Sequence, residues 1–152
     1  MFKKYGVFGI VLIILVEINF FLKIEPLATW YFPIVWLGYI LVLDALVFKI
    51  KTDSMISSRP REIIGLLLLS ALFWWIFEFV NLSINNWRYQ GTENLGNMIN
   101  LYSTISFSTV LPAFFETTEL MRAIHLFDNK KLHKHYKITK HFLHCMMFLG
   151  FV

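Results

Sequence analysis

Long apolar segments alternate with short polar ones along most of the chain. Four of them cover residues 5–22, 29–48, 63–84 and 98–120. Each approaches the roughly 20 residues that an α-helix needs to cross a bilayer. A fifth, residues 142–152, would reach only partway across. The pattern predicts an all-α, polytopic transmembrane helical bundle, a single domain over residues 1–152 with four full spans and a partial or truncated fifth.

Composition agrees with a bilayer environment. The chain is 57% hydrophobic and only 16% charged, which lies well outside the balance of soluble domains. A net charge of +4 would suggest nucleic acid in a soluble protein, but here the basic residues sit between the apolar segments. We therefore expect membrane lipid, and no nucleic acid, as a partner. The sequence leaves open whether the chain works alone or as a homo- or hetero-oligomer.

The distribution of basic residues predicts an orientation, because short cytoplasmic loops carry an excess of Lys and Arg. With a cytoplasmic N-terminus, twelve of the 14 basic residues fall inside and only Lys23 and Arg88 fall outside. Because the four spans alternate in direction, this one orientation accounts for the distribution of Lys and Arg. We expect a multi-pass protein of the inner (cytoplasmic) membrane.

Carboxylates inside the spans are the first candidates for chemistry, since burying one costs about 2.5–3.5 kcal/mol at a helix centre. Two should lie in the outer half of the bilayer, Glu17 and Glu78. Three should lie towards the cytoplasmic side, Asp44, Glu116 and Glu119. Depth therefore sorts these groups into two layers.

Two polar stripes run along spans three and four. Spacings of three and four residues place each set on one helical face. The stripe on the third span is Trp74, Glu78, Asn81 and Asn85, and that on the fourth is Thr109, Pro112, Glu116 and Glu119. Pro112 removes a backbone hydrogen bond, so we expect a kink that opens room for a ligand.

Three interpretations of the stripes stay open. Polar side chains can join helices that lack a hydrophobic driving force. A carboxyl group in hydrocarbon can stay protonated near neutral pH and act as a general acid. The same carboxylates can also pass ions or protons, as in a small transporter.

Metal and cofactor sites are not expected. Two histidines, His133 and His135, lie among lysines that repel a cation, and His141 with His144 offers only two ligands. The sequence also contains no phosphate-binding glycine loop, nucleophile elbow or zinc-protease motif.

Two stretches together resemble the lycopene cyclase domain family, the membrane-embedded carotenoid cyclases. The first is Glu78 followed by Trp87-Arg88-Tyr89, which is similar to the family's acidic residue followed by Trp-x-aromatic. The second is the segment 111–119, LPAFFETTE, which resembles the family's helix with a proline and a glutamate pair. The family's glutamates are adjacent, whereas here two residues separate Glu116 from Glu119.

The resemblance implies redox-neutral cyclisation or isomerisation of a lipophilic isoprenoid or carotenoid, without a cofactor. It makes Glu116 the leading proton donor, with Glu78 or Glu119 as a second carboxyl. It also implies that Trp74 and Trp87 stabilise a carbocation through their ring faces. Asn81, Tyr89 and Pro112 complete the expected substrate-binding residues. The alternative is a non-catalytic membrane subunit or a small transporter.

Overall fold

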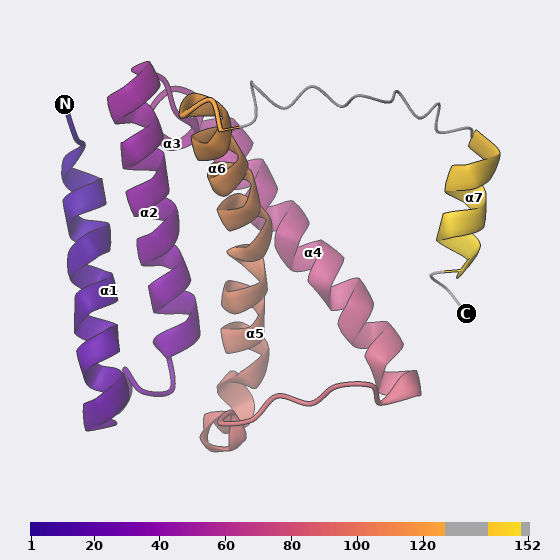
Figure 1. Cartoon of the computed structure of the whole chain (residues 1–152). Coiled ribbons are helices and arrows are strands. Elements are labelled where there is room, and N and C mark those ends of the chain that lie inside the picture. The colour runs from indigo at the N-terminus through magenta and orange to yellow at the C-terminus, as the bar shows by residue number, and fades with distance from the viewer. Residues whose placement is uncertain (127–139, 150–152) are drawn as a thin grey trace.

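The computed structural model describes residues 1–126 and 140–149, which are helical and contain no strand in those ranges. The helices, with η1 of the 3-10 type, are α1 Lys4–Leu22, α2 Tyr31–Lys51, α3 Met55–Ser58, α4 Pro60–Ile84, η1 Glu93–Met98, α5 Ile99–Ser108, α6 Val110–Ala123 and α7 Lys140–Leu149. Figure 1 shows α1, α2, α4 and the α5–α6 pair running in alternating directions. The chain thus folds as an up-and-down array of long helices.

Four helical segments are long and apolar enough to cross a membrane: α1, α2, α4 and the stretch Leu95–Ala123, which contains α5 and α6. The predicted polytopic helical bundle is therefore confirmed. Helix ends differ by a few residues from the sequence-based bounds. The third span, for example, begins at Pro60, because proline is favoured in the first helical turn. Helix α7 overlaps the last apolar segment, and residues 150–152 lie outside the described residues.

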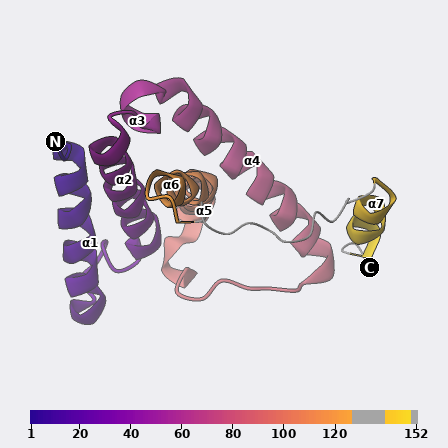
Figure 2. The same ribbon diagram turned by 45° about the horizontal axis from the view of Figure 1, so that its top comes forward.

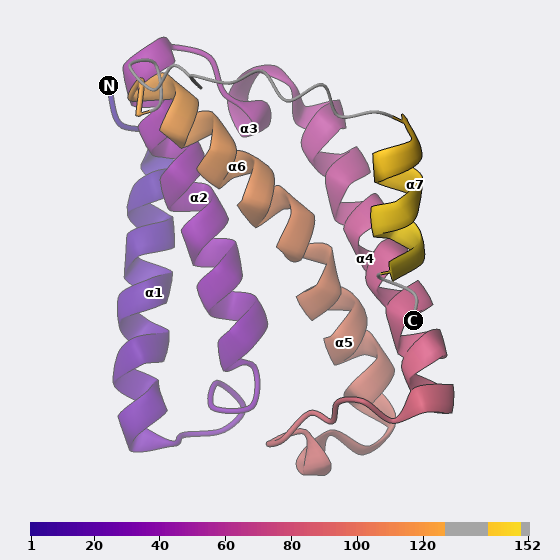
Figure 3. The same ribbon diagram turned by 45° about the vertical axis from the view of Figure 1, so that its right-hand side comes forward.

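The α5–α6 pair occupies the middle of the bundle. Helix α6 packs against α2 on one side and α4 on the other, while α1 packs along α2 at the edge. Figures 2 and 3 show the same order from two further directions. Helices α5 and α6 both contact α2 and α4. Side chains of α5 therefore lie at one end of the interior, and side chains of α6 lie at the other.

Helices α1 and α2 approach each other closely at two glycines. A Cβ atom added at Gly9 would lie 2.7 Å from the backbone oxygen of Gly38, and one at Gly38 would lie 2.9 Å from the oxygen of Gly9. Small residues at such crossings allow the close backbone packing that holds helices together in lipid. The α1–α2 pair therefore depends on both glycines.

The fourth span is interrupted at Thr109, three residues before Pro112. Proline lacks an amide hydrogen and its ring disturbs the preceding turn, so backbone groups there lose their helical partners. Ser70 on α4 supplies replacements: its hydroxyl donates to the Phe107 carbonyl at 2.5 Å and accepts from the Leu111 amide at 3.0 Å. The helix is thus interrupted near Pro112, and a buried serine of α4 provides hydrogen-bond partners for the backbone groups there.

Candidate functional site: an aromatic cavity with a carboxylate behind its wall

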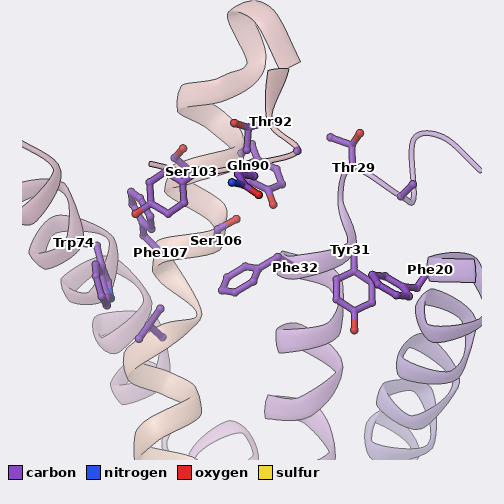
Figure 4. Close-up of a pocket in the computed structure, with 15 residues that line it drawn as sticks. Phe20, Thr29, Tyr31, Phe32, Trp74, Gln90, Thr92, Ser103, Ser106 and Phe107 are labelled. Atoms are coloured by element: carbon purple, nitrogen blue, oxygen red, sulfur yellow. The ribbon is translucent and has the colours of Figure 1, made fainter. Parts of the chain in front are cut away.

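A cavity of about 430 Å³ lies between α1, α2, α4 and α5, at the end of the bundle where the loops before α2 and after α4 meet. Figure 4 shows Trp74 and Phe107 on one side, with Phe32, Tyr31 and Phe20 on the other. The lining residues are Phe20, Ala28, Thr29, Tyr31, Phe32, Trp74, Tyr89, Gln90, Gly91, Thr92, Tyr102, Ser103, Ser106, Phe107 and Val110.

Seven of the 15 lining residues of the cavity are aromatic. Trp74 stacks on Phe107 with ring centroids 6.1 Å apart and planes at 26°. Tyr89 packs against the same Phe107 ring, with the two ring centroids 6.2 Å apart. On the opposite wall Phe20 packs against Tyr31 at 5.5 Å. Such a wall offers both apolar area and π faces to a ligand.

The polar groups that reach the cavity are uncharged. Hydroxyl and amide side chains lie towards its loop end, among them Thr29, Gln90, Thr92 and Ser103. Its 15 lining residues include no Asp, Glu, Lys or Arg. The cavity therefore fits a neutral ligand with a few hydrogen-bonding groups.

Glu78 lies directly behind this wall. Its Oε1 accepts hydrogen bonds from Trp87 Nε1 at 2.9 Å and from the Tyr89 hydroxyl at 2.5 Å. Burial, together with the bond to Glu78, raises the pKa of Tyr89 to about 12, so the phenol stays protonated. Tyr89 thus links the cavity to a carboxylate that does not itself line it.

Asn81 anchors the loop that carries Trp87 and Tyr89. Its amide nitrogen donates to the Trp87 carbonyl at 3.0 Å, and its Oδ1 accepts from the amides of Asn86 at 2.9 Å and Trp87 at 3.2 Å. Asn81 is therefore a structural residue here, and it contributes to the cavity only by positioning the loop.

A second carboxylate–tyrosine pair lies on the opposite wall. The Tyr31 hydroxyl donates to Glu17 on α1 at 2.6 Å, and Tyr31 also lines the cavity. Glu17 and Glu78 thus belong to the same end of the bundle. This agrees with the sequence-based placement of Glu17 and Glu78 in one layer.

The other three carboxylates cluster near the N-terminal end of α1, where α3 joins α4. Asp44 is fully buried and accepts hydrogen bonds from Tyr5, from Ser54 Oγ at 2.9 Å and from the Ile56 amide at 2.8 Å. Glu119 pairs with Arg59 at 2.6 Å. That hydrogen-bonded pair raises the pKa of Arg59, which keeps the guanidinium charged.

Glu116 is fully buried in this second cluster, and neither of its carboxylate oxygens has a hydrogen-bond partner in the described part of the chain. It does not line the cavity, and neither do Glu119 and Pro112. The structure therefore groups Glu116 with Asp44 and Glu119, whereas Glu78 lies with Trp87 and Tyr89. The reason is depth: Glu116 follows the break at Thr109, on the side away from the cavity.

The remaining candidates divide as follows. Trp74 and Tyr89 line the cavity, whereas Trp87 does not line it and donates a hydrogen bond to Glu78. No group of three or more His, Cys, Asp or Glu side chains within residues 1–126 and 140–149 has a metal-binding arrangement. His133 and His135 lie outside the described residues.

Sequence reasoning missed most of the aromatic and hydroxyl lining. Five of the missed residues come from α5 and the start of α6: Tyr102, Ser103, Ser106, Phe107 and Val110. They recur at spacings of one, three, one and three, which places them on one helical face. This face of aromatic and hydroxyl side chains could have been predicted from the sequence. The prediction instead rested on the stripe that carries Glu116 and Glu119.

The chain was also compared with known proteins. No family model, curated protein or solved structure matches it. The geometry of the cavity and of the two carboxylate clusters therefore carries the functional argument.

Proposed function

We propose that the chain binds a lipophilic isoprenoid, such as the end group of a carotenoid or another polyene, in the aromatic cavity. The observation that carries this proposal is the cavity itself: about 430 Å³, walled by aromatic rings and free of charged lining residues. Sites for small molecules have volumes of roughly 300–1,000 Å³, so this one accommodates a ligand segment of moderate size.

The lining supports a ligand with an apolar body and a neutral polar end. Trp74, Phe107 and Phe32 would contact the hydrocarbon, and the hydroxyl and amide groups of Thr29, Gln90 and Ser103 would accept or donate hydrogen bonds. A diphosphate would find no Arg or Lys among the lining residues. The proposal therefore favours an isoprenoid alcohol, quinone or hydrocarbon over a phosphorylated precursor.

We further propose the cytoplasmic membrane as the location, with a cytoplasmic N-terminus. The support is the excess of Lys and Arg near the N-terminus and in the segments after α2 and α6. In that orientation the cavity lies in the outer half of the bilayer. A lipophilic ligand would enter it from the acyl chains.

Acid-catalysed cyclisation or isomerisation of the bound polyene is the second function that we propose. It is supported by the resemblance to carotenoid cyclases and by the stacked Trp74 and Phe107 rings, whose faces could stabilise a developing cation. Glu78 would act through Tyr89 as a positioning residue. The Tyr89 phenol, which lines the cavity, would give a proton to one carbon, and the carbocation would return a proton to the phenolate from another carbon, so the reaction is redox-neutral.

Binding can be tested with purified protein in lipid nanodiscs. Titration with geranylgeraniol should quench the tryptophan fluorescence saturably, because the ligand would sit against Trp74. The variant Ser103→Phe fills the cavity from α5 and should weaken binding at least about tenfold, equivalent to about 1.4 kcal/mol. Leu101→Phe, on the exposed face of the same helix, is the matched control and should bind as the wild type does.

Equal binding by both variants would argue against the cavity as the site. Geranylgeranyl diphosphate should bind more weakly than the alcohol, because the lining has no basic residue. Turnover is a separate question. Expression in cells that accumulate lycopene, followed by pigment chromatography, should give a cyclic or isomerised product if the second function holds, and Trp74→Leu should reduce its yield.

A further inference from the structure

The buried carboxylates at the other end of the bundle differ in their partners. Asp44 has three donors: a hydroxyl from α1, a hydroxyl beside α3 and a backbone amide of α3. Glu119 has Arg59. Glu116, fully buried between them, has no hydrogen-bond partner on either oxygen among the described residues.

The difference in hydrogen-bond partners decides which of these carboxyl groups can carry a negative charge. A buried carboxylate anion without donors is strongly disfavoured, whereas one that accepts two or three hydrogen bonds is stabilised. Asp44 meets the second condition. Glu116 meets the first, and it lies within electrostatic range of Asp44 and Glu119. Two adjacent anions in one buried site would repel each other, so the unpartnered group is the one that takes up a proton.

The charged and titratable groups around Glu116 come from each neighbouring element. Asp44 comes from α2, Tyr5 of α1 reaches the site through Asp44, and Glu119 comes from α6 itself. Arg59, between α3 and α4, also acts on Glu116, but its hydrogen bonds go to Glu119 and Glu62. Arg59 therefore neutralises Glu119 and leaves Glu116 without a dedicated cation.

We propose that Glu116 is a proton-binding site at the α2–α6 contact, where a proton held on its carboxyl group lets it donate a hydrogen bond to the Asp44 carboxylate. The bound proton then joins α6 to α2. Loss of the proton leaves two anions facing each other and weakens that contact. This site is separate from the aromatic cavity and does not depend on the ligand proposed there.

Infrared difference spectroscopy tests the proposal on the full chain in nanodiscs. At neutral pH the wild type should show a protonated-carboxyl C=O band that shifts in D₂O. Glu116→Gln should abolish that band, while Glu119→Gln, changed in the same cluster, should retain it. A spectrum in which Glu116→Gln removes only carboxylate bands would overturn the proposal.

Two further measurements keep the test decisive if a variant folds poorly. Wild-type protein labelled with heavy carbon at the glutamate side-chain carboxyls should show the band moving with the label, which excludes Asp44 as its source. Adding sodium chloride should leave the band in place. Disappearance of the band on addition of sodium would mean that the site holds a metal cation instead, and would also overturn the proposal.

Glu116→Gln has a second expected property. The amide of Gln can donate to Asp44 as a protonated carboxyl does, so this variant should keep the α2–α6 contact but lose its pH dependence. Glu116→Leu, which cannot donate, should lower the thermal stability. If Gln and Leu destabilise equally, the proposed hydrogen bond to Asp44 is absent.

Discussion

Tyr89 and Glu78 are joined by a hydrogen bond of 2.5 Å across eleven residues of chain. Tyr89 belongs to the loop after α4 and lines the cavity. Glu78 belongs to α4 itself and does not line the cavity. One contact therefore fixes the position of a cavity wall and gives a span carboxylate a polar partner.

Replacing Tyr89 with Phe should loosen the loop without unfolding the bundle. The variant keeps the ring that packs against Phe107 and removes only the hydroxyl bond to Glu78. We expect a local loss on the order of 1 kcal/mol, because Tyr89 is about half exposed and Trp87 still donates to Glu78. Hydrogen exchange should show faster exchange of residues 86–92, with the amides of α1 and α2 unchanged.

The Tyr89 phenol should titrate late. Its pKa is raised from 10.0 to about 12, so the neutral form is favoured in the folded state. The contribution of its hydrogen bond to stability should be complete below pH 10 and should be lost as the pH rises through about 12. Ultraviolet titration of tyrosinate should show that Tyr89→Phe lacks a residue titrating near pH 12 in the wild type. A Tyr89→Phe curve identical to that of the wild type would contradict this assignment.

Ser70→Ala should destabilise the break between α5 and α6. The change leaves the Phe107 carbonyl and the Leu111 amide without the hydroxyl that serves both. An unsatisfied buried polar group costs about 1–3 kcal/mol. Thermal unfolding in nanodiscs should therefore show a clear loss for Ser70→Ala and almost none for Ser83→Ala, an exposed serine on the same helix.

Gly9→Leu should separate α1 from α2. The new Cβ would lie 2.7 Å from the Gly38 oxygen, a rigid backbone atom, so the helices must move apart at a cost of roughly 1–3 kcal/mol. Gly65→Leu is the control, because no atom lies within 4 Å of its added Cβ. Unfolding measurements on the two variants should differ clearly, and equal stability would mean that the close approach is not needed.

Sequence patterns predicted the fold well because span length and apolar content are local properties. The break near Pro112 and the two layers of carboxylates were also predictable, since both follow from position along a helix. The hydrogen-bond partners of each carboxylate were not predictable. Nothing local indicates that Arg59 would reach Glu119 across 60 residues of chain, or that Tyr31 would reach Glu17.

The candidate site was predicted only in part for the same reason. Trp74 was predicted from the stripe that it shares with Glu78, and Tyr89 from the resemblance to the carotenoid cyclases. Phe20, Phe32 and Phe107 are three of sixteen phenylalanines, and only the packing of α1, α2 and α5 distinguishes them from those that face lipid. The different surroundings of Glu78 and Glu116 were not predictable, because a helical stripe identifies a face of the helix but not the neighbouring element that covers each turn.

Photo-crosslinking tests the proposed cavity most directly. A geranylgeraniol analogue that carries a diazirine should be activated in nanodiscs with the wild-type chain, and the labelled peptides mapped by mass spectrometry. We predict labels on residues 28–32, 89–92 and 102–110, competed by unlabelled geranylgeraniol and lost in Ser103→Phe. Labels spread over the exposed faces of α1 and α4, with no competition, would contradict the account.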